Sequence, residues 1–132
     1  MERKIRILVG CSKGLNRSKY LAEYLRRKGY STRFGGVEGF DDSNMKWNPI
    51  TQKLVDWADI IIVVRERLKD SLKKKFKTKD KKIVVVDVTD SKKLIPEELS
   101  HLRDLDYLTF QKKWTRPQLR KAIKPHLPLK LK

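Results

Sequence analysis

Four short apolar stretches along the chain predict β-strands. Residues 4–10 (KIRILVG) combine aliphatic and β-branched side chains and end at a glycine, which is typical of a buried strand that stops at a turn. Residues 30–34 form a second candidate, ended by Gly35 and Gly36. Residues 60–64 are continuously apolar, as in a strand covered on both faces, and residues 83–86 form a fourth strand.

Segments with helical spacing lie between these strands. From Asn16 or Arg17 to Lys28, apolar residues recur at helical intervals, and Gly29 supplies a C-terminal stop: Tyr20, Leu21, Tyr24 and Leu25. After a predicted loop over residues 37–47, Asn48-Pro49 opens a second helix. Thr51 is its predicted cap, and Leu54, Val55 and Ala58 form its inner face.

A third, basic helix is predicted from Glu66 to about Lys75, followed by a solvated lysine-rich connection over residues 77–82. Pro96 starts a further helix, and Pro117 starts another that runs to about Lys124. Residues 103–114 carry no clear period.

The alternation of strands and helices predicts an α/β fold with a four-stranded parallel sheet flanked by helices. At 132 residues the chain fits one domain over residues 1–132, with 91–132 the least defined segment. In such a sheet the carboxyl ends of all strands open onto one edge. That edge receives Cys11 after the first strand and residues 87–90 after the fourth.

The composition of the chain limits the partners and the cellular compartment that are expected for the protein. The 33 Lys and Arg residues against 16 Asp and Glu give a formal net charge of +17, which favours acidic partners such as nucleic acid, anionic lipid or phosphorylated protein, or forms a solvated surface. A single cysteine excludes an internal disulfide and suits a reducing cytoplasm. No stretch reaches the length of a membrane span, and His101 and His126 lack partners at metal-ligand spacing, so neither a membrane partner, a metal nor a cofactor is expected.

Cys11 and Arg17 bracket a loop with the chemistry of an anion site. The backbone N–H groups of such a loop can converge on a phosphate, and the following helix adds partial positive charge at the same point. This field favours the nucleophilic thiolate of Cys11, while the planar fork of Arg17 matches two phosphate oxygens. Ser18 is positioned to donate its hydroxyl to the Cys11 sulfur. The predicted phosphate-binding residues are Ser12, Lys13, Gly14, Leu15, Asn16, Arg17 and Ser18.

These residues resemble the low-molecular-weight protein tyrosine phosphatases, especially the short prokaryotic members, whose loop has the form Cys-x5-Arg-Ser after the first strand. Cys11, Arg17, Ser18 and Ala22 fall at matching positions, and further matches cover Gly35-Gly36, residues 48–51 and residues 57–63. The resemblance spans roughly residues 4–90. It implies the flavodoxin-like architecture of that family and a phosphocysteine intermediate in the hydrolysis of phosphomonoesters, of the phosphotyrosine type.

The resemblance also implies a general acid on the loop after the fourth strand. The matching segment carries Asp90, which is favoured because it lies further into the loop, and Asp87, which is the second candidate. Three features depart from the family pattern: Gly14 stands where an asparagine usually supports the loop, Lys19 follows Ser18 where the family has proline, and residues 91–93 (SKK) replace the usual aromatic side chains. The implied partners are a phosphorylated protein or small phosphomonoester, with inorganic phosphate as product or inhibitor.

Other functions share parts of this pattern. Arsenate reductases use the same loop with further cysteines, and phosphotransferase subunits with a phosphoacceptor cysteine do not need Arg17. A non-catalytic phosphate or nucleic-acid binder on the same fold is the alternative from a different class. For it, Tyr107, Phe110 and Trp114 either stack on bases or pack the C-terminal segment against the core.

Overall fold

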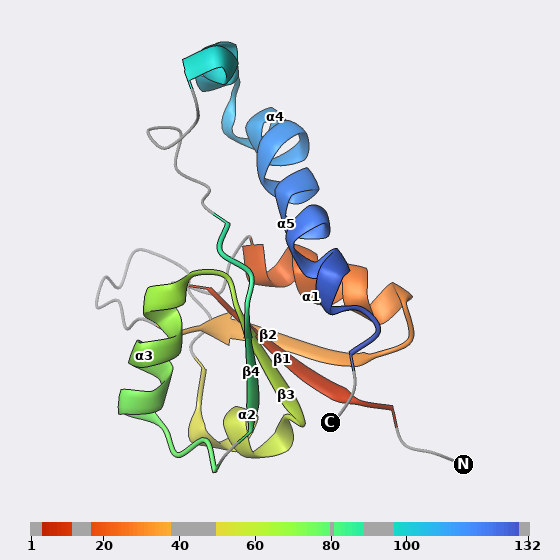
Figure 1. Cartoon of the computed structure of the whole chain (residues 1–132), viewed down its shortest axis with the longest axis vertical. Helices are drawn as coiled ribbons and strands as arrows, with labels where there is room; N and C mark the ends of the chain where they lie inside the picture. The colour runs from red at the N-terminus through yellow and green to blue at the C-terminus, as the bar shows by residue number, and fades with distance from the viewer. Residues whose placement is uncertain (1–3, 12–16, 38–49, 80, 89–96, 130–132) are drawn as a thin grey trace.

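The structure is a computed structural model and describes residues 4–11, 17–37, 50–79, 81–88 and 97–129 (Figure 1). Strands and helices alternate over its first two thirds, and helices make up the rest. In chain order the elements are β1 (Arg6–Cys11), α1 (Arg17–Arg27), β2 (Ser31–Gly36), α2 (Gln52–Trp57), β3 (Ile60–Val63), α3 (Glu66–Lys75), β4 (Lys82–Val85), the 3₁₀-helix η2 (Glu97–Asp104), α4 (Tyr107–Phe110), the π-helix η3 (Gln111–Thr115), α5 (Arg116–Ile123) and the 3₁₀-helix η4 (Lys124–His126).

The four strands form one parallel sheet in the order β2-β1-β3-β4, which confirms the predicted fold class. The central strands β1 and β3 are apolar and buried over almost their whole length. Such continuous burial is expected where helices cover both faces of a parallel sheet. The edge strand β4 is buried less, because only one side of it meets another strand.

Helices cover the sheet on both faces (Figure 1). The right-handed crossovers place α1 on one face, and α2 and α3 on the other, because the strand order reverses direction after β2. Helix α5 returns to pack beside α1. The core is closed by fully buried leucines and an isoleucine on the inner sides of these helices: Leu21, Leu25, Leu68, Leu72, Leu119 and Ile123.

Most predicted boundaries hold, and two are corrected at the carboxyl edge of the sheet. Thr51 caps α2, accepting a hydrogen bond from the Leu54 backbone N–H at 3.2 Å, and Gly29 follows α1 with φ of 105°. Cys11, which was predicted to begin a turn, is the last residue of β1 and lies opposite Gly36 of β2. The predicted second strand is therefore too short, since pairing with β1 extends β2 through both glycines.

The C-terminal segment is more helical than predicted. Helices α4, η3 and α5 follow one another without a break from Tyr107 to Ile123, although only the part after Pro117 was predicted. A π-turn carries an extra residue and disrupts the 3.6-residue period, which explains why residues 103–114 gave no clear pattern. The π-turn directly precedes Pro117, whose ring clashes with the carbonyl four residues earlier in a regular helix. We infer that the wider turn accommodates this proline.

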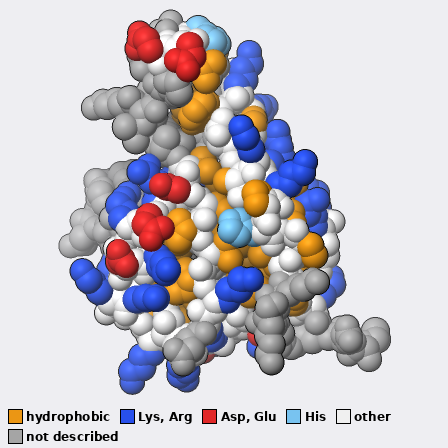
Figure 2. Space-filling view, viewed as in Figure 1, with side chains coloured by type: hydrophobic (Ala, Val, Ile, Leu, Met, Phe, Trp, Pro, Cys, Tyr) orange, Lys and Arg blue, Asp and Glu red, His pale blue; other side chains and the backbone are white. Residues whose placement is uncertain are grey.

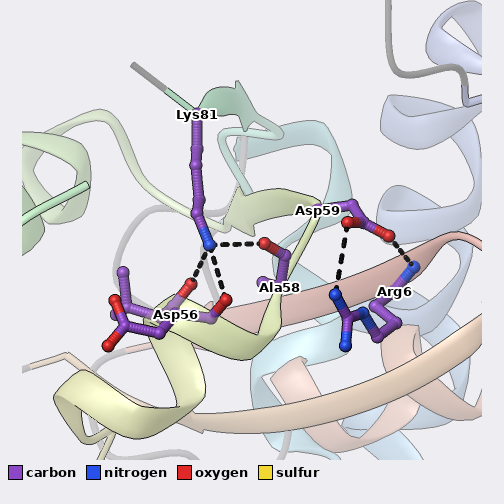
Figure 3. A network of polar contacts seen from close by, with 6 residues as sticks. Arg6, Asp56, Ala58, Asp59 and Lys81 are labelled. Carbon is purple, nitrogen blue, oxygen red and sulfur yellow. Dashed lines mark hydrogen bonds and ion pairs between the residues drawn. The ribbon is translucent and has the colours of Figure 1, made fainter. Parts of the chain in front are cut away.

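The amino edge of the sheet is held by Lys81 (Figure 3). Its Nζ donates to the backbone oxygens of Val55, Asp56 and Ala58 at 2.6, 2.9 and 2.6 Å, at the C-terminal end of α2. Burial lowers the pKa of Lys81, and the carboxylates of Asp56 and Asp59 oppose that shift. Three acceptors require the ammonium form, because a neutral amine has only two N–H groups. The lysine-rich connection was predicted to be solvated throughout. Instead, it contains Lys81, which caps the C-terminal end of α2.

Arg6 and Asp59 make a second contact at this edge. One carboxylate oxygen of Asp59 accepts from the Arg6 backbone N–H at 2.9 Å, and the other lies 3.7 Å from the Arg6 guanidinium. These bonds join the start of β1 to the residue that precedes β3.

In the parts of the chain that the structure describes, no helix combines the length and hydropathy needed to cross a membrane.

Candidate active site

The candidate site lies at the carboxyl end of β1, where the connections of the sheet diverge. The chain leaves β1 towards β2 on one side, whereas it leaves the neighbouring β3 towards β4 on the other. In open α/β sheets this divergence leaves a crevice outside the strand ends, and ligands bind there. Topology alone therefore points to the end of β1, which is Cys11.

Cys11 is held rigidly at this point. Its backbone oxygen accepts a hydrogen bond from the Val37 N–H at 2.8 Å, and its side chain is 3% exposed. The Sγ atom lies 3.1 Å from the hydroxyl of Ser18, which is itself fully buried in the first turn of α1. The predicted pairing of Ser18 with the Cys11 sulfur is thus present. A hydroxyl at this distance can donate to a thiolate and stabilise its negative charge.

Arg17 is the first residue of α1 and is buried, with 6% of its surface exposed. Its Nη1 donates to the backbone oxygen of Val88 at 2.8 Å, a contact between residues 71 positions apart. A cation at a helix N-terminus is opposed by the helix dipole, and its burial carries a desolvation cost. A charge placed in such an unfavourable position is typical of a functional site, where a bound anion offsets the cost of burying the cation.

The contact between Arg17 and Val88 also fixes the start of the loop after β4. The Val88 backbone N–H donates to the Val64 oxygen at 2.9 Å, so residue 88 runs alongside the end of β3. Asp90 follows two residues later, and it lies outside the described residues, as do the predicted phosphate-binding residues Ser12, Lys13, Gly14, Leu15 and Asn16. Both segments begin at residues that the structure brings to the same edge.

Asp87, the second predicted acid, is engaged elsewhere. Its Oδ1 lies 2.8 Å from Arg65 Nε, and its side chain is 59% exposed. The neighbouring Val86 and Val88 are buried, so Asp87 points to the opposite side of the extended backbone. The Asp87 side chain is therefore engaged in an ion pair at the surface.

Two partners in this site were not predicted. The Val88 oxygen that receives Arg17 is a backbone group, and nothing in the side-chain pattern reveals it. Arg65 lies two residues after β3, and Asp87 lies two residues after the neighbouring β4, so adjacency of the two strands would have suggested their pairing. Within the described residues no three His, Cys, Asp or Glu side chains gather as a metal site.

One aromatic residue of the C-terminal segment is settled as a core residue. Phe110 is fully buried, and Leu99, Leu105 and Trp114 pack against it in a small separate cluster. This agrees with core packing for Phe110 and removes it as a candidate base-stacking group, whereas Trp114 is only half-buried. The side chain of Tyr107 lies outside the described part of the structure.

Comparison with known proteins identifies the fold. No family model matches the sequence, and no curated protein matches it either. The arginine phosphatase YwlE from Geobacillus stearothermophilus superposes with a TM-score of 0.61 at 19% identity, over 91% of this chain and 88% of its own. Wzb from Vibrio vulnificus, solved with benzylphosphonate, gives a TM-score of 0.64 at 15% identity, over 93% and 97% of the two chains. A low-molecular-weight phosphotyrosine phosphatase from Vibrio cholerae O395 gives a TM-score of 0.58 at 17% identity, over 89% and 91%. The chain therefore has the low-molecular-weight phosphatase fold that the sequence predicted.

Proposed function

We propose that the chain is a cysteine-dependent phosphatase that hydrolyses phosphomonoesters through a phosphocysteine intermediate. The observation that carries the proposal is the buried trio at the end of β1: Cys11 beside the Ser18 hydroxyl at 3.1 Å, with buried Arg17 at the start of α1. A thiol, a hydroxyl and a guanidinium at a helix N-terminus match the needs of a phosphoryl group. The group needs a nucleophile, a donor to the sulfur and a fork for its oxygens.

The first step transfers the phosphoryl group to sulfur. The Cys11 thiolate attacks phosphorus, the bond between phosphorus and the ester oxygen breaks, and the leaving oxygen takes a proton from an acid. Arg17 and the loop N–H groups stabilise the charge on the equatorial oxygens in the transition state. We assign the acid to Asp90, because the Asp87 side chain is exposed and paired with Arg65, whereas its neighbours Val86 and Val88 are buried.

The second step returns the free enzyme. Asp90, now ionised, removes a proton from a water molecule that attacks phosphorus, and the bond between phosphorus and sulfur breaks. The Ser18 hydroxyl stabilises the departing thiolate through the 3.1 Å contact. The products are an alcohol or phenol and inorganic phosphate, which can rebind as an inhibitor. A free thiol nucleophile suits a reducing compartment such as the cytoplasm.

An aryl phosphate monoester is the substrate class that we propose, either a phosphorylated protein or a small molecule. Two of the proteins that share this fold support the choice: one is named a phosphotyrosine phosphatase, and another was solved with benzylphosphonate. YwlE is named an arginine phosphatase, so the same fold also serves a phosphorus–nitrogen bond. Phosphoarginine is therefore the competing substrate to include in the assay.

The test is hydrolysis of an activated aryl phosphate by the full chain and by Cys11→Ser purified in parallel, with circular dichroism to verify folding. We expect the variant to lose at least about 10³-fold in rate, because it lacks the thiolate nucleophile. Activity retained in Cys11→Ser rules out the phosphocysteine route. A wild-type protein that binds phosphate but never turns over supports instead a non-catalytic binder on the same fold.

The acid is tested with a matched pair of variants, Asp90→Asn and Asp87→Asn. Asp90→Asn should slow hydrolysis of an ester with a poor leaving group by about 10²–10⁴-fold and of an activated ester far less, because a good leaving group needs little protonation. Asp87→Asn should behave nearly as wild type in both assays. The reverse result moves the acid to Asp87.

A further inference from the structure

Exposed positive charge is concentrated on the layer formed by the helices α1, η3 and α5. Over residues 17–28 and 111–124 the exposed or half-exposed side chains include one acid, Glu23. The basic residues that accompany it are Lys19, Arg26, Arg27, Lys28, Lys112, Lys113, Arg116, Arg120, Lys121 and Lys124. We call these ten residues the basic face, and Figure 2 shows lysine and arginine side chains along the side of the molecule where α5 lies.

The opposite layer is mixed. Helices α2 and α3 carry six exposed or half-exposed basic residues and three acidic ones, Asp56, Glu66 and Asp70, and the connection after α3 adds the exposed Lys77 and Lys79. Each layer also uses a cation inside the fold: Lys75 donates from its Nζ to the Val37 oxygen at 2.8 Å, and Arg26 of the basic face donates to Thr32. The charge of +17 is therefore distributed unevenly, which a purely solubilising surface does not require.

Contacts with tyrosines hold part of the basic face in place. Arg120 Nη1 donates to the Tyr20 hydroxyl at 2.6 Å, and the Arg116 guanidinium lies 5.2 Å from the centroid of the same ring. Tyr24 stacks on Tyr20, and Lys28 Nζ lies 5.0 Å from the Tyr24 centroid. Cations ordered in this way lose less side-chain entropy when they bind an anion than freely moving ones do.

The shape and composition of this face favour a nucleic acid over an acidic protein. Residues 111–124 extend about 20 Å at the helical rise, much longer than one phosphate group and comparable to several base pairs of a duplex. Protein interfaces have an apolar centre. Here the half-buried rings of Tyr20 and Tyr24 are instead covered by Arg116 and Lys28. A face with ten cations and one exposed carboxylate suits the repeated phosphates of a duplex backbone.

We propose that the basic face binds duplex nucleic acid through its phosphates, without reading the base sequence. This activity does not depend on Cys11, because the ten residues lie outside the candidate active site. Nucleic-acid binding is a second activity beside the proposed phosphatase reaction. It keeps the protein that carries out this reaction bound to a polyanion.

The test uses fluorescence anisotropy with a labelled mixed-sequence DNA duplex of about two helical turns, titrated with the full chain at several salt concentrations. The variant K112Q/K113Q/K121Q/K124Q removes four charges from the basic face. The matched control R67Q/K69Q/K73Q/K74Q removes four charges from α3, so the two variants have the same net charge.

We expect the basic-face variant to lose at least tenfold in affinity and the slope of log affinity against log salt to fall by about two to four. The α3 control should lose much less. Equal losses in the two variants, or binding of polyglutamate as tight as binding of the duplex, would overturn the proposal. Hydrolysis of a small aryl phosphate should be unchanged in both variants, which separates this result from the fate of the proposed phosphatase reaction.

Discussion

Lys81 and Arg17 are cations at opposite edges of the sheet, and the helix end beside each one affects it in the opposite way. Lys81 lies at the C-terminal end of α2, where its ammonium meets three helix carbonyls and the dipole stabilises it. Arg17 lies at the N-terminal end of α1, buried, where the dipole opposes it. The amino edge thus gains stability from its cation, whereas the carboxyl edge holds a buried cation that we propose binds the phosphoryl group of the substrate.

Arg17→Lys gives the largest effect expected from this comparison. Lysine keeps the charge but presents a single point donor in place of the planar fork, so we expect a loss of at least about 10²-fold in kcat/KM with aryl phosphate. The thermal unfolding temperature should fall slightly, because lysine loses the bond that Arg17 Nη1 donates to the Val88 oxygen. The matched control is Arg65→Lys, whose partly exposed ion pair with Asp87 predicts a change of less than about threefold. Equal losses in the two variants would show that the planar fork of Arg17 has no specific role in the reaction.

Lys81→Met should affect stability and leave catalysis intact. The substitution keeps an aliphatic chain but removes three hydrogen bonds at the end of α2, so we expect the free energy of unfolding to fall by about 1–3 kcal/mol. Urea unfolding measures this change, with Lys77→Met as control, because that exposed side chain lies in the same connection. If kcat falls as steeply in Lys81→Met as in Arg17→Lys, the division between a structural edge and a chemical edge is wrong.

Ser18→Ala should give the smallest of the three effects. Loss of the hydroxyl removes a bond of about 1–1.5 kcal/mol to sulfur, which corresponds to roughly a five- to tenfold slower turnover. The loss should fall on breakdown of the phosphoenzyme, where the thiolate departs, so a burst of phenol followed by a slower steady state is expected. A burst that disappears together with a fall in the steady-state rate would place the role of Ser18 in the first step instead.

The same comparison explains what could be predicted from the sequence. Cys11, Arg17 and Ser18 were recognised because a strand, a loop and a helix have distinct local patterns, and their chemistry depends on residue type and spacing. The strand ends were less accurate, since Gly35 and Gly36 belong to β2 only through their pairing with β1. The cap formed by Lys81 was missed because its acceptors are backbone carbonyls more than 20 residues away.

The C-terminal segment was hardest for a different reason. Helix prediction relies on a regular period, and the π-turn over Gln111–Thr115 breaks that period just before Pro117. The anchoring of Arg17 by the Val88 oxygen was equally invisible, because a backbone acceptor carries no sequence signal. Contacts of this kind follow from the topology of the sheet.

The central claim is the phosphocysteine, and the chain offers a direct measurement because Cys11 is its only cysteine. The full chain is mixed with an aryl phosphate and quenched in denaturant within the burst, and the digested peptides are weighed by mass spectrometry. The account predicts one phosphoryl group on the peptide that contains Cys11 and none on that peptide in Cys11→Ala, which has no nucleophile at this position. Release of phenol with no phosphorylated Cys11 peptide, or with the phosphoryl group on another residue, would contradict it.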